Sequence, residues 1–261
     1  MLIFCHIEKA AGISVHRILH KNFPGYISPS PKKKFGVIDR SYFDLLQKFY
    51  PIPVTGIGGH KVSVIDIAKK DDFVFTIVRD PLDRFLSHLN WRTEVMGEKY
   101  CLQEYCAEEM GFCNFQCKRI CGKQSADAAI ATFEEHFDVV GIFEIFHESL
   151  VAISSLCTNS ELKICTSVSN ATSSKNRQFE RRFLSESELD MIRACNLEDE
   201  KMYRWVVENY RQLILDQSAM DICKYEEEYA KIDDLKRKLS NIYLSRIVQP
   251  LLSAGAGYRQ K

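Results

Sequence analysis

The chain has 261 residues, 46% of them hydrophobic and 27% charged, so it can bury a sizeable core and falls at the upper end of single-domain sizes. Its 35 basic residues balance 35 acidic ones, which leaves no electrostatic case for nucleic acid or an anionic membrane as the main partner. No apolar run reaches the ~18 to 20 residues of a membrane-spanning helix and no signal peptide is recognisable, so we expect a cytoplasmic protein, or a luminal one if the chain is a fragment.

The N-terminal part of the chain alternates between strand-like and helix-like segments. Residues 2–7 form a short run of apolar and β-branched residues typical of a strand, and residues 14–21 have the pattern of a helix. Residues 24–34 carry turn formers and a basic triplet, which predicts a surface loop. Residues 39–50 predict an amphipathic helix, and the glycines of residues 56–59 predict a tight turn.

The same alternation continues through the middle of the chain. Residues 73–78 are apolar nearly throughout, as in a strand buried on both faces of a parallel sheet, and a helix is expected from Leu82 onward. Residues 137–143 predict a third strand, followed by a helix over residues 147–157. Two further helices are expected, at residues 186–192 and 199–213.

This order of elements predicts one α/β domain over residues 1–261, with a P-loop-like, three-layer α/β/α architecture around a central parallel sheet. In such folds, ligands bind at the carboxyl ends of the strands. Residues 1–215 form the expected core. Residues 216–261 are expected to be a helical C-terminal extension, since Leu235 and Leu239 begin an apolar stripe at helical spacing, and it would pack on the domain or join copies into a homo-oligomer.

The chain contains ten cysteines, and half of them fall between Cys101 and Cys121. Their spacings lack the paired C-x-x-C pattern of a typical zinc site. We therefore expect reduced thiols that pack as small apolar groups, or two disulfides in this cluster if the chain comes from a secreted or luminal protein.

A first candidate anion site lies where the first strand meets the first helix, over residues 9–14. Consecutive backbone N–H groups at a helix start attract anions, Gly12 lets the backbone approach an oxyanion closely, Ser14 offers a hydroxyl, and Lys9 adds a charge. A Walker A sequence is absent, which weakens a nucleoside-triphosphatase interpretation.

A second candidate site follows the strand over residues 73–78. Arg79 lies at the end of that strand, Pro81 suits the first turn of the next helix, and Ser87 lies one to two turns along it. Arg79 and Ser87 could converge on one phosphate. The alternative is a surface ion pair between Arg79 and Asp83, worth under about 1 kcal/mol, with Ser87 as a neutral helix position.

Together the two sites resemble those of sulfotransferases that use 3′-phosphoadenosine 5′-phosphosulfate (PAPS), in particular the carbohydrate (heparan sulfate 2-O-) sulfotransferase-like branch. Residues 6–14, H-I-E-K-A-A-G-I-S, look like the family's 5′-phosphosulfate loop, H-I-P-K-T-A-G-T-S. Residues 79–87 match its 3′-phosphate motif, R-D-P-x-x-R-x-x-S, at every defining position. The resemblance covers about residues 2–210, with further similarity at residues 59–60, 114–122 and 140–144.

The resemblance implies transfer of a sulfuryl group from PAPS to an acceptor hydroxyl, expected to be on a carbohydrate, without a metal. His60 resembles the general base, and Lys9 would hold the bridging and sulfuryl oxygens. The 5′ phosphosulfate would be held by Lys9, Ala10, Ala11, Gly12, Ile13 and Ser14, and the 3′ phosphate by Arg79 and Ser87. The family's nucleotide-closing loop would correspond to Ser173, Ser174 and Lys175, and the residues facing the acceptor to His88 and Asn90.

Three departures from the family pattern leave other functions open. Glu8 replaces the family's proline, and Ala10 and Ile13 replace threonines, which removes two hydroxyl donors and puts a carboxylate beside an anion site. One alternative is therefore a catalytically inert module that binds PAPS or a glycan. Another is a P-loop-like kinase that acts on a small alcohol.

Overall fold

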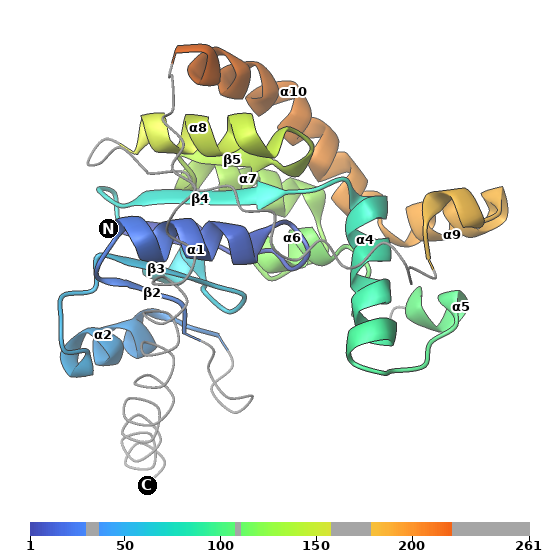
Figure 1. Cartoon of the computed structure of the whole chain (residues 1–261), viewed down its shortest axis with the longest axis horizontal. Coiled ribbons are helices and arrows are strands. Elements are labelled where there is room, and N and C mark those ends of the chain that lie inside the picture. The colour runs from blue at the N-terminus through green and yellow to red at the C-terminus, as the bar shows by residue number, and fades with distance from the viewer. Residues whose placement is uncertain (30–36, 108–110, 158–178, 221–261) are drawn as a thin grey trace, which may run out of the picture.

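The computed structural model describes residues 1–29, 37–107, 111–157 and 179–220. Within them, five parallel strands form one sheet in the order β2-β3-β1-β4-β5 (Figure 1). The strands are β1 (Leu2–Cys5), β2 (Tyr26–Ile27), β3 (Gly56–Gly59), β4 (Phe73–Val78) and β5 (Val139–Ile142). The predicted central parallel sheet is confirmed, and the three apolar runs singled out in the sequence are its three adjacent strands β1, β4 and β5.

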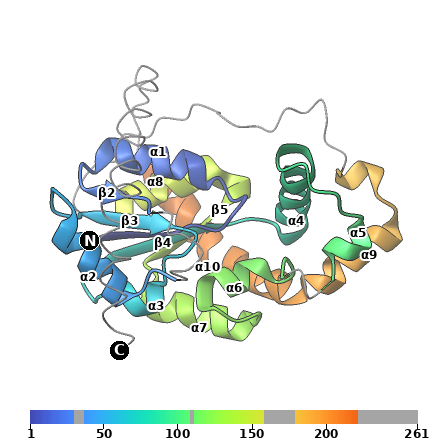
Figure 2. The same ribbon diagram turned by 90° about the horizontal axis from the view of Figure 1, so that it is seen from below.

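Helices cover both faces of the sheet, so that the predicted three-layer α/β/α architecture is confirmed (Figure 2). One face packs against α1 (Gly12–Asn22) and α8 (Phe146–Leu156), and its core includes Phe4 and Phe75. The other face packs against α2, α3 and α7, and its core includes Ile3. The bounds of these three helices are Arg40–Phe49, Val64–Ile67 and Ala126–His136.

The long helix α10 (Leu197–Met220) closes the edge of the sheet next to β5 and contacts both α7 and α8. It contains the helix predicted over residues 199–213 and extends it at both ends. The structure thus has a helical C-terminal part, while the remainder of the expected C-terminal extension, residues 221–261, lies outside the described residues.

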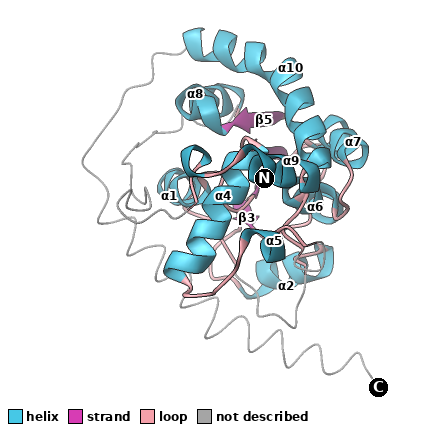
Figure 3. Ribbon diagram, turned by 90° about the vertical axis from the view of Figure 1, so that its right-hand side faces the viewer, coloured by secondary structure: helices cyan, strands magenta, loops and turns pink. Residues whose placement is uncertain are grey.

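A smaller group of helices lies beyond the carboxyl ends of the strands (Figures 1 and 3). It consists of α4 (Pro81–Asn90), α5 (Leu102–Tyr105) and α9 (Glu186–Cys195), which share a third apolar cluster. Helix α4 begins where the sequence predicts, because the Asp80 carboxylate caps it by accepting the N–H of Asp83 at 2.9 Å and proline occupies its first position. This group borders the edge of the sheet where ligands bind in such folds.

The prediction of a tight turn at residues 56–59 is wrong, because these residues form strand β3. A Cβ atom on Gly58 would lie 2.0 Å from the Tyr26 hydroxyl and 3.0 Å from Cβ of Phe4, so the absent side chain makes room for neighbours across the sheet. Tyr26 itself belongs to β2, a two-residue strand inside the segment that we expected to be only loop.

The described cysteines are free thiols, and several are buried, as expected for small apolar groups. Cys113 and Cys117 are buried inside the cluster that the sequence highlights. None of the described helices combines the length and the apolar character that a membrane span would need.

Candidate functional site

The loop between β1 and α1 has the backbone geometry of an anion site. Lys9 and Ala11 adopt left-handed backbone conformations, with φ of 72° and 59°, a strain that non-glycine residues tolerate mostly at functional positions. Among the described residues, the backbone N–H groups of Ala11, Gly12 and Ile13 find no acceptor. The Ala10 N–H is engaged, since it donates to the carbonyl of Ile7 at 3.3 Å. Three neighbouring donors therefore remain for a ligand at the start of α1.

Gly12 serves a purpose that the sequence did not reveal. It is buried, and a Cβ atom there would lie 1.7 Å from Nε2 of His6. The space next to its Cα is thus filled by the imidazole of His6 and not by the approach path of an anion. The glycine is required because the loop folds tightly over this ring.

Arg79 lies directly beside this loop. It follows β4, which pairs with β1, so the two segments leave the sheet at the same edge. Nη1 of Arg79 donates to the Lys9 carbonyl at 3.0 Å, and its guanidinium lies 4.4 Å from the ring centroid of Phe143. The structure therefore brings the two predicted anion-binding motifs together.

Asp83, the alternative partner considered for Arg79, is paired with Arg181. Nε of Arg181, from a distant part of the chain, donates to Asp83 at 2.7 Å, and the same guanidinium also binds Asp80. Ser87 lies half-buried on α4, and within the described residues its hydroxyl makes no hydrogen bond. Among the described residues, the Ser87 hydroxyl is therefore not taken up by a carboxylate of α4.

Gln116, in helix α6 (Phe115–Cys121), holds the backbone of Arg79. Its Oε1 accepts the Arg79 N–H at 3.0 Å and its Nε2 donates to the Arg79 carbonyl at 2.8 Å. The buried Asp199 carboxylate accepts the N–H groups of Gln116 and Cys117 at 3.0 and 2.8 Å, which caps α6. Sequence reasoning missed both roles; the likeness at residues 114–122 was the one available signal.

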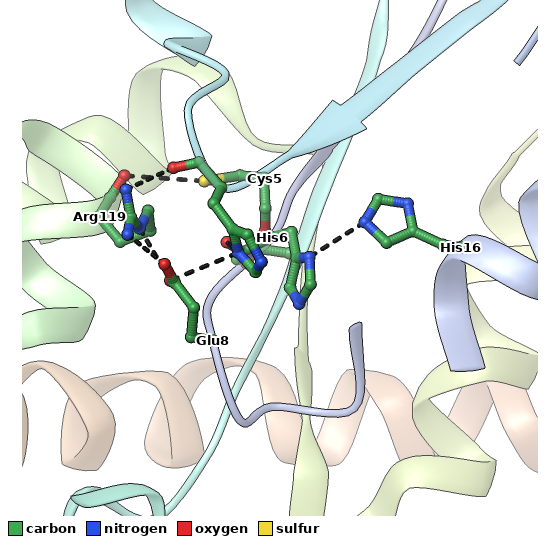
Figure 4. A network of polar contacts seen from close by, with 7 residues as sticks. Cys5, His6, Glu8, His16 and Arg119 are labelled. Carbon is green, nitrogen blue, oxygen red and sulfur yellow. Dashed lines mark hydrogen bonds and ion pairs between the residues drawn. The ribbon is translucent and has the colours of Figure 1, made fainter. Parts of the chain in front are cut away.

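His60 follows β3 at the same edge of the sheet, and its side chain is 47% exposed. Its Nδ1 lies 3.3 Å from the carbonyl oxygen of His6 and 3.5 Å from Oε2 of Glu8. Arg119 binds the Glu8 carboxylate through two nitrogens (Figure 4). It also donates to the His60 carbonyl. Burial alone would raise the pKa of Glu8, but its bond to His60 and the charge of Arg119 outweigh it and leave that pKa below its ordinary value.

A buried row of polar rings lies behind His60. The His6 ring is 3.9 Å from the His60 ring between centroids, and its Nδ1 is 3.0 Å from Nε2 of His16, whose Nδ1 is 2.7 Å from the Tyr26 hydroxyl. Burial, followed by the nearby His60, His16 and Arg119, holds the pKa of His6 well below its ordinary value. His6 is therefore a neutral ring that packs against His60 at the back of the site.

His88 and Asn90 are not open to an acceptor, contrary to the expectation from the family. His88 is buried between the rings of Trp91 and Phe115, at centroid distances of 5.8 Å each. The Asn90 side chain binds the backbone of Phe179, donating at 2.7 Å and accepting at 2.9 Å. Both residues have structural roles at this end of the molecule.

The buried His88 makes stability depend on pH. Burial, and next the charge of Arg84, lowers the pKa of His88 from 6.5 to about 3. On acidification, the unfolded chain therefore binds a proton at this position that the folded chain does not bind. Between pH 7 and pH 5 we expect the wild type to lose about 2 kcal/mol more unfolding free energy than His88→Gln. Denaturant titrations at the two pH values measure this, with His147→Gln, which removes an exposed imidazole, as the control; parallel losses in wild type and His88→Gln would contradict it.

Three predicted site residues, Ser173, Ser174 and Lys175, lie outside the described residues. No known family model matches the chain, and no curated protein matches its sequence.

Proposed function

We propose that this protein is a PAPS-dependent sulfotransferase that passes the sulfuryl group to a hydroxyl of an acceptor, a carbohydrate. The observation that carries the proposal is the hydrogen bond of 3.0 Å from Arg79 Nη1 to the Lys9 carbonyl. It joins the two segments that resemble the 5′-phosphosulfate loop and the 3′-phosphate motif. One nucleotide with charge at both ends could then span them.

The residues present fit such a nucleotide. The free backbone N–H groups of Ala11, Gly12 and Ile13 would bind the 5′ phosphosulfate, and the Lys9 ammonium would balance its charge. Because these donors are backbone N–H groups, they are present without the hydroxyl groups of the two threonines that the loop lacks. Arg79 and Ser87 would bind the 3′ phosphate, the group that distinguishes PAPS from ordinary adenylates.

The negative charge of Glu8 suggests that it would repel an anion in this loop, but this charge has a partner. The structure pairs its carboxylate with Arg119 through two hydrogen bonds, so that its charge is compensated locally. This arrangement removes the main physical reason for assuming that the departures from the family pattern have made the protein inert.

The catalytic roles follow from position. His60 would take the proton from the acceptor hydroxyl, a role that suits a partly exposed imidazole. Lys9 would stabilise the negative charge that grows on the bridging oxygen as the nucleotide leaves. Holding donor and acceptor in line between these two side chains supplies the remainder of the rate enhancement.

Titration calorimetry with adenosine 3′,5′-bisphosphate tests the proposal. Arg79→Ala is expected to weaken binding by about 1.5 to 3 kcal/mol, or roughly 10- to 150-fold, because a charged hydrogen bond to the 3′ phosphate is lost. The same substitution should change the affinity for adenosine 5′-monophosphate much less, since that ligand lacks the 3′ phosphate. Arg182→Ala is the matched control, because Arg182 is 70% exposed and pairs with Glu180.

Equal bisphosphate affinity in wild type and Arg79→Ala would contradict the proposal. A second measurement, consumption of PAPS over a panel of carbohydrate and other hydroxyl acceptors, separates an enzyme from an inert binding module. A protein that binds the bisphosphate tightly and consumes no PAPS with any acceptor would favour the inert module.

A further inference from the structure

We infer that Glu8 is a positioning residue that holds His60 with Nδ1 turned inward, so that Nε2 is the atom that accepts the proton of the acceptor hydroxyl. The inference rests on the proposed function for its catalytic meaning and on the geometry of this chain for its structural content. Position 8 is a proline in the family that the loop resembles, so the pairing is a property of this sequence.

Two oxygens face the same nitrogen of the His60 ring. The His6 carbonyl lies 3.3 Å from Nδ1 and Oε2 of Glu8 lies 3.5 Å from it. Both are acceptors, which favours the tautomer of His60 with a proton on Nδ1. In a neutral imidazole the other nitrogen, Nε2, then has a free lone pair.

Arg119 fixes both partners of this contact. Its Nε donates to Oε2 of Glu8 at 3.0 Å and a second nitrogen donates to Oε1 (Figure 4). Its Nη1 donates to the His60 carbonyl. Its guanidinium lies 4.8 Å from the ring centroid of Phe115, which limits its own movement. One arginine therefore sets the distance between the Glu8 carboxylate and the His60 backbone.

Within the part of the chain that the structure describes, His60 contacts three charged or titratable residues, Glu8, Arg119 and His6. The His6 ring, 3.9 Å away between centroids, stays neutral because burial lowers its pKa, and Arg119 is occupied by Glu8. Among the described residues, Glu8 is the one carboxylate paired with His60. It is thus the carboxylate that a positive charge on this ring would face, and it shares this carboxylate with Arg119.

The chemical step follows directly. The acceptor oxygen gives its proton to Nε2 of His60 and forms a bond to sulfur. The bond from sulfur to the bridging oxygen breaks, and its electron pair stays on that oxygen of the departing bisphosphate. The imidazolium formed on His60 is balanced by the Glu8 carboxylate and later releases its proton to solvent, as a carboxylate supports a histidine base in other enzymes.

The tautomer of His60 tests the inference without any turnover. In a ¹⁵N-labelled wild-type sample at about pH 8, where an ordinary imidazole is neutral, we expect long-range ¹⁵N–¹H spectra to show His60 with the proton on Nδ1. In Glu8→Ala, a large fraction with the proton on Nε2 should appear. Glu8→Gln keeps an acceptor oxygen at the same place and should restore the wild-type tautomer, while Asp44→Asn, which removes an exposed carboxylate paired with Arg40, is the control.

Turnover gives the second readout. Glu8→Ala should reduce kcat for PAPS-dependent transfer by roughly 10- to 100-fold with bisphosphate affinity unchanged within about threefold, because a positioning residue acts on the base and not on nucleotide binding. A wild-type tautomer in Glu8→Ala would overturn the inference even if the wild type proves to be a sulfotransferase. A shifted tautomer in a protein that never consumes PAPS would support the geometry and leave the proposed function as the part that fails.

Discussion

Replacing His60 by alanine is expected to reduce the proposed sulfuryl transfer by about 10²- to 10⁴-fold, the usual contribution of a general base. Bisphosphate affinity should stay within about twofold of the wild type, since the donors assigned to the nucleotide are Lys9, Arg79 and the backbone of the loop. The side chain is 47% exposed and lies outside the core, so its loss should leave the fold intact.

Initial rates of PAPS consumption, paired with calorimetry on the same samples, measure both quantities for His60→Ala. His147→Ala is the matched control, because it removes another exposed imidazole, which belongs to α8. If bisphosphate affinity fell as far as the rate, the His60 ring would be binding the nucleotide and the assignment of a base would be wrong.

Gly12→Ala is expected to lower the free energy of unfolding by at least about 3 kcal/mol, at the upper end for added volume in a packed site. The new Cβ would lie 1.7 Å from Nε2 of His6, and this ring is held by His16 and stacked on Phe4. The clash therefore involves a ring with no free space and cannot be relieved by a flexible side chain.

A double-mutant cycle identifies the cause of the Gly12→Ala loss. In Gly12→Ala combined with His6→Ala the clash disappears, so the combined loss should be smaller than the sum of the two single losses, a coupling that denaturant titrations can measure. Gly97→Ala is the control, because no atom lies within 4 Å of its Cβ and only its positive φ of 70° opposes the change. Strict additivity of the two substitutions would contradict the proposed contact.

The central strands could be read from the sequence because their environment is uniform. β1, β4 and β5 are buried on both faces, which demands continuous apolar runs such as residues 73–78. β3 could not be predicted in this way, because its glycines leave room for the side chains of Tyr26 and Phe4 on neighbouring strands. Such contacts between strands do not appear in the local sequence pattern. β2 has only two residues, which is too short to show any period.

The site was predictable to the extent that topology determines it. Arg79 and Lys9 follow strands that pair side by side, so the carboxyl ends of these strands must meet at one edge. Arg119, Gln116 and Asp199 could not be foreseen, because each meets its partner across a long stretch of chain. A single carboxylate or amide in a sequence does not reveal which distant backbone group or side chain it binds.

The support of Arg79 by Gln116, and of Gln116 by Asp199, has a consequence for how small the protein can be made. The two motifs that we assign to the nucleotide end at Ser87, yet the carboxylate that caps α6 belongs to α10, near the end of the described chain. A fragment that ends soon after β5 would contain both motifs in full. It would lack Asp199, which holds α6 and, through Gln116, the backbone of Arg79 in the second motif. Possession of the signature residues is therefore a poor guide to a minimal working unit, whose boundary must fall beyond Asp199.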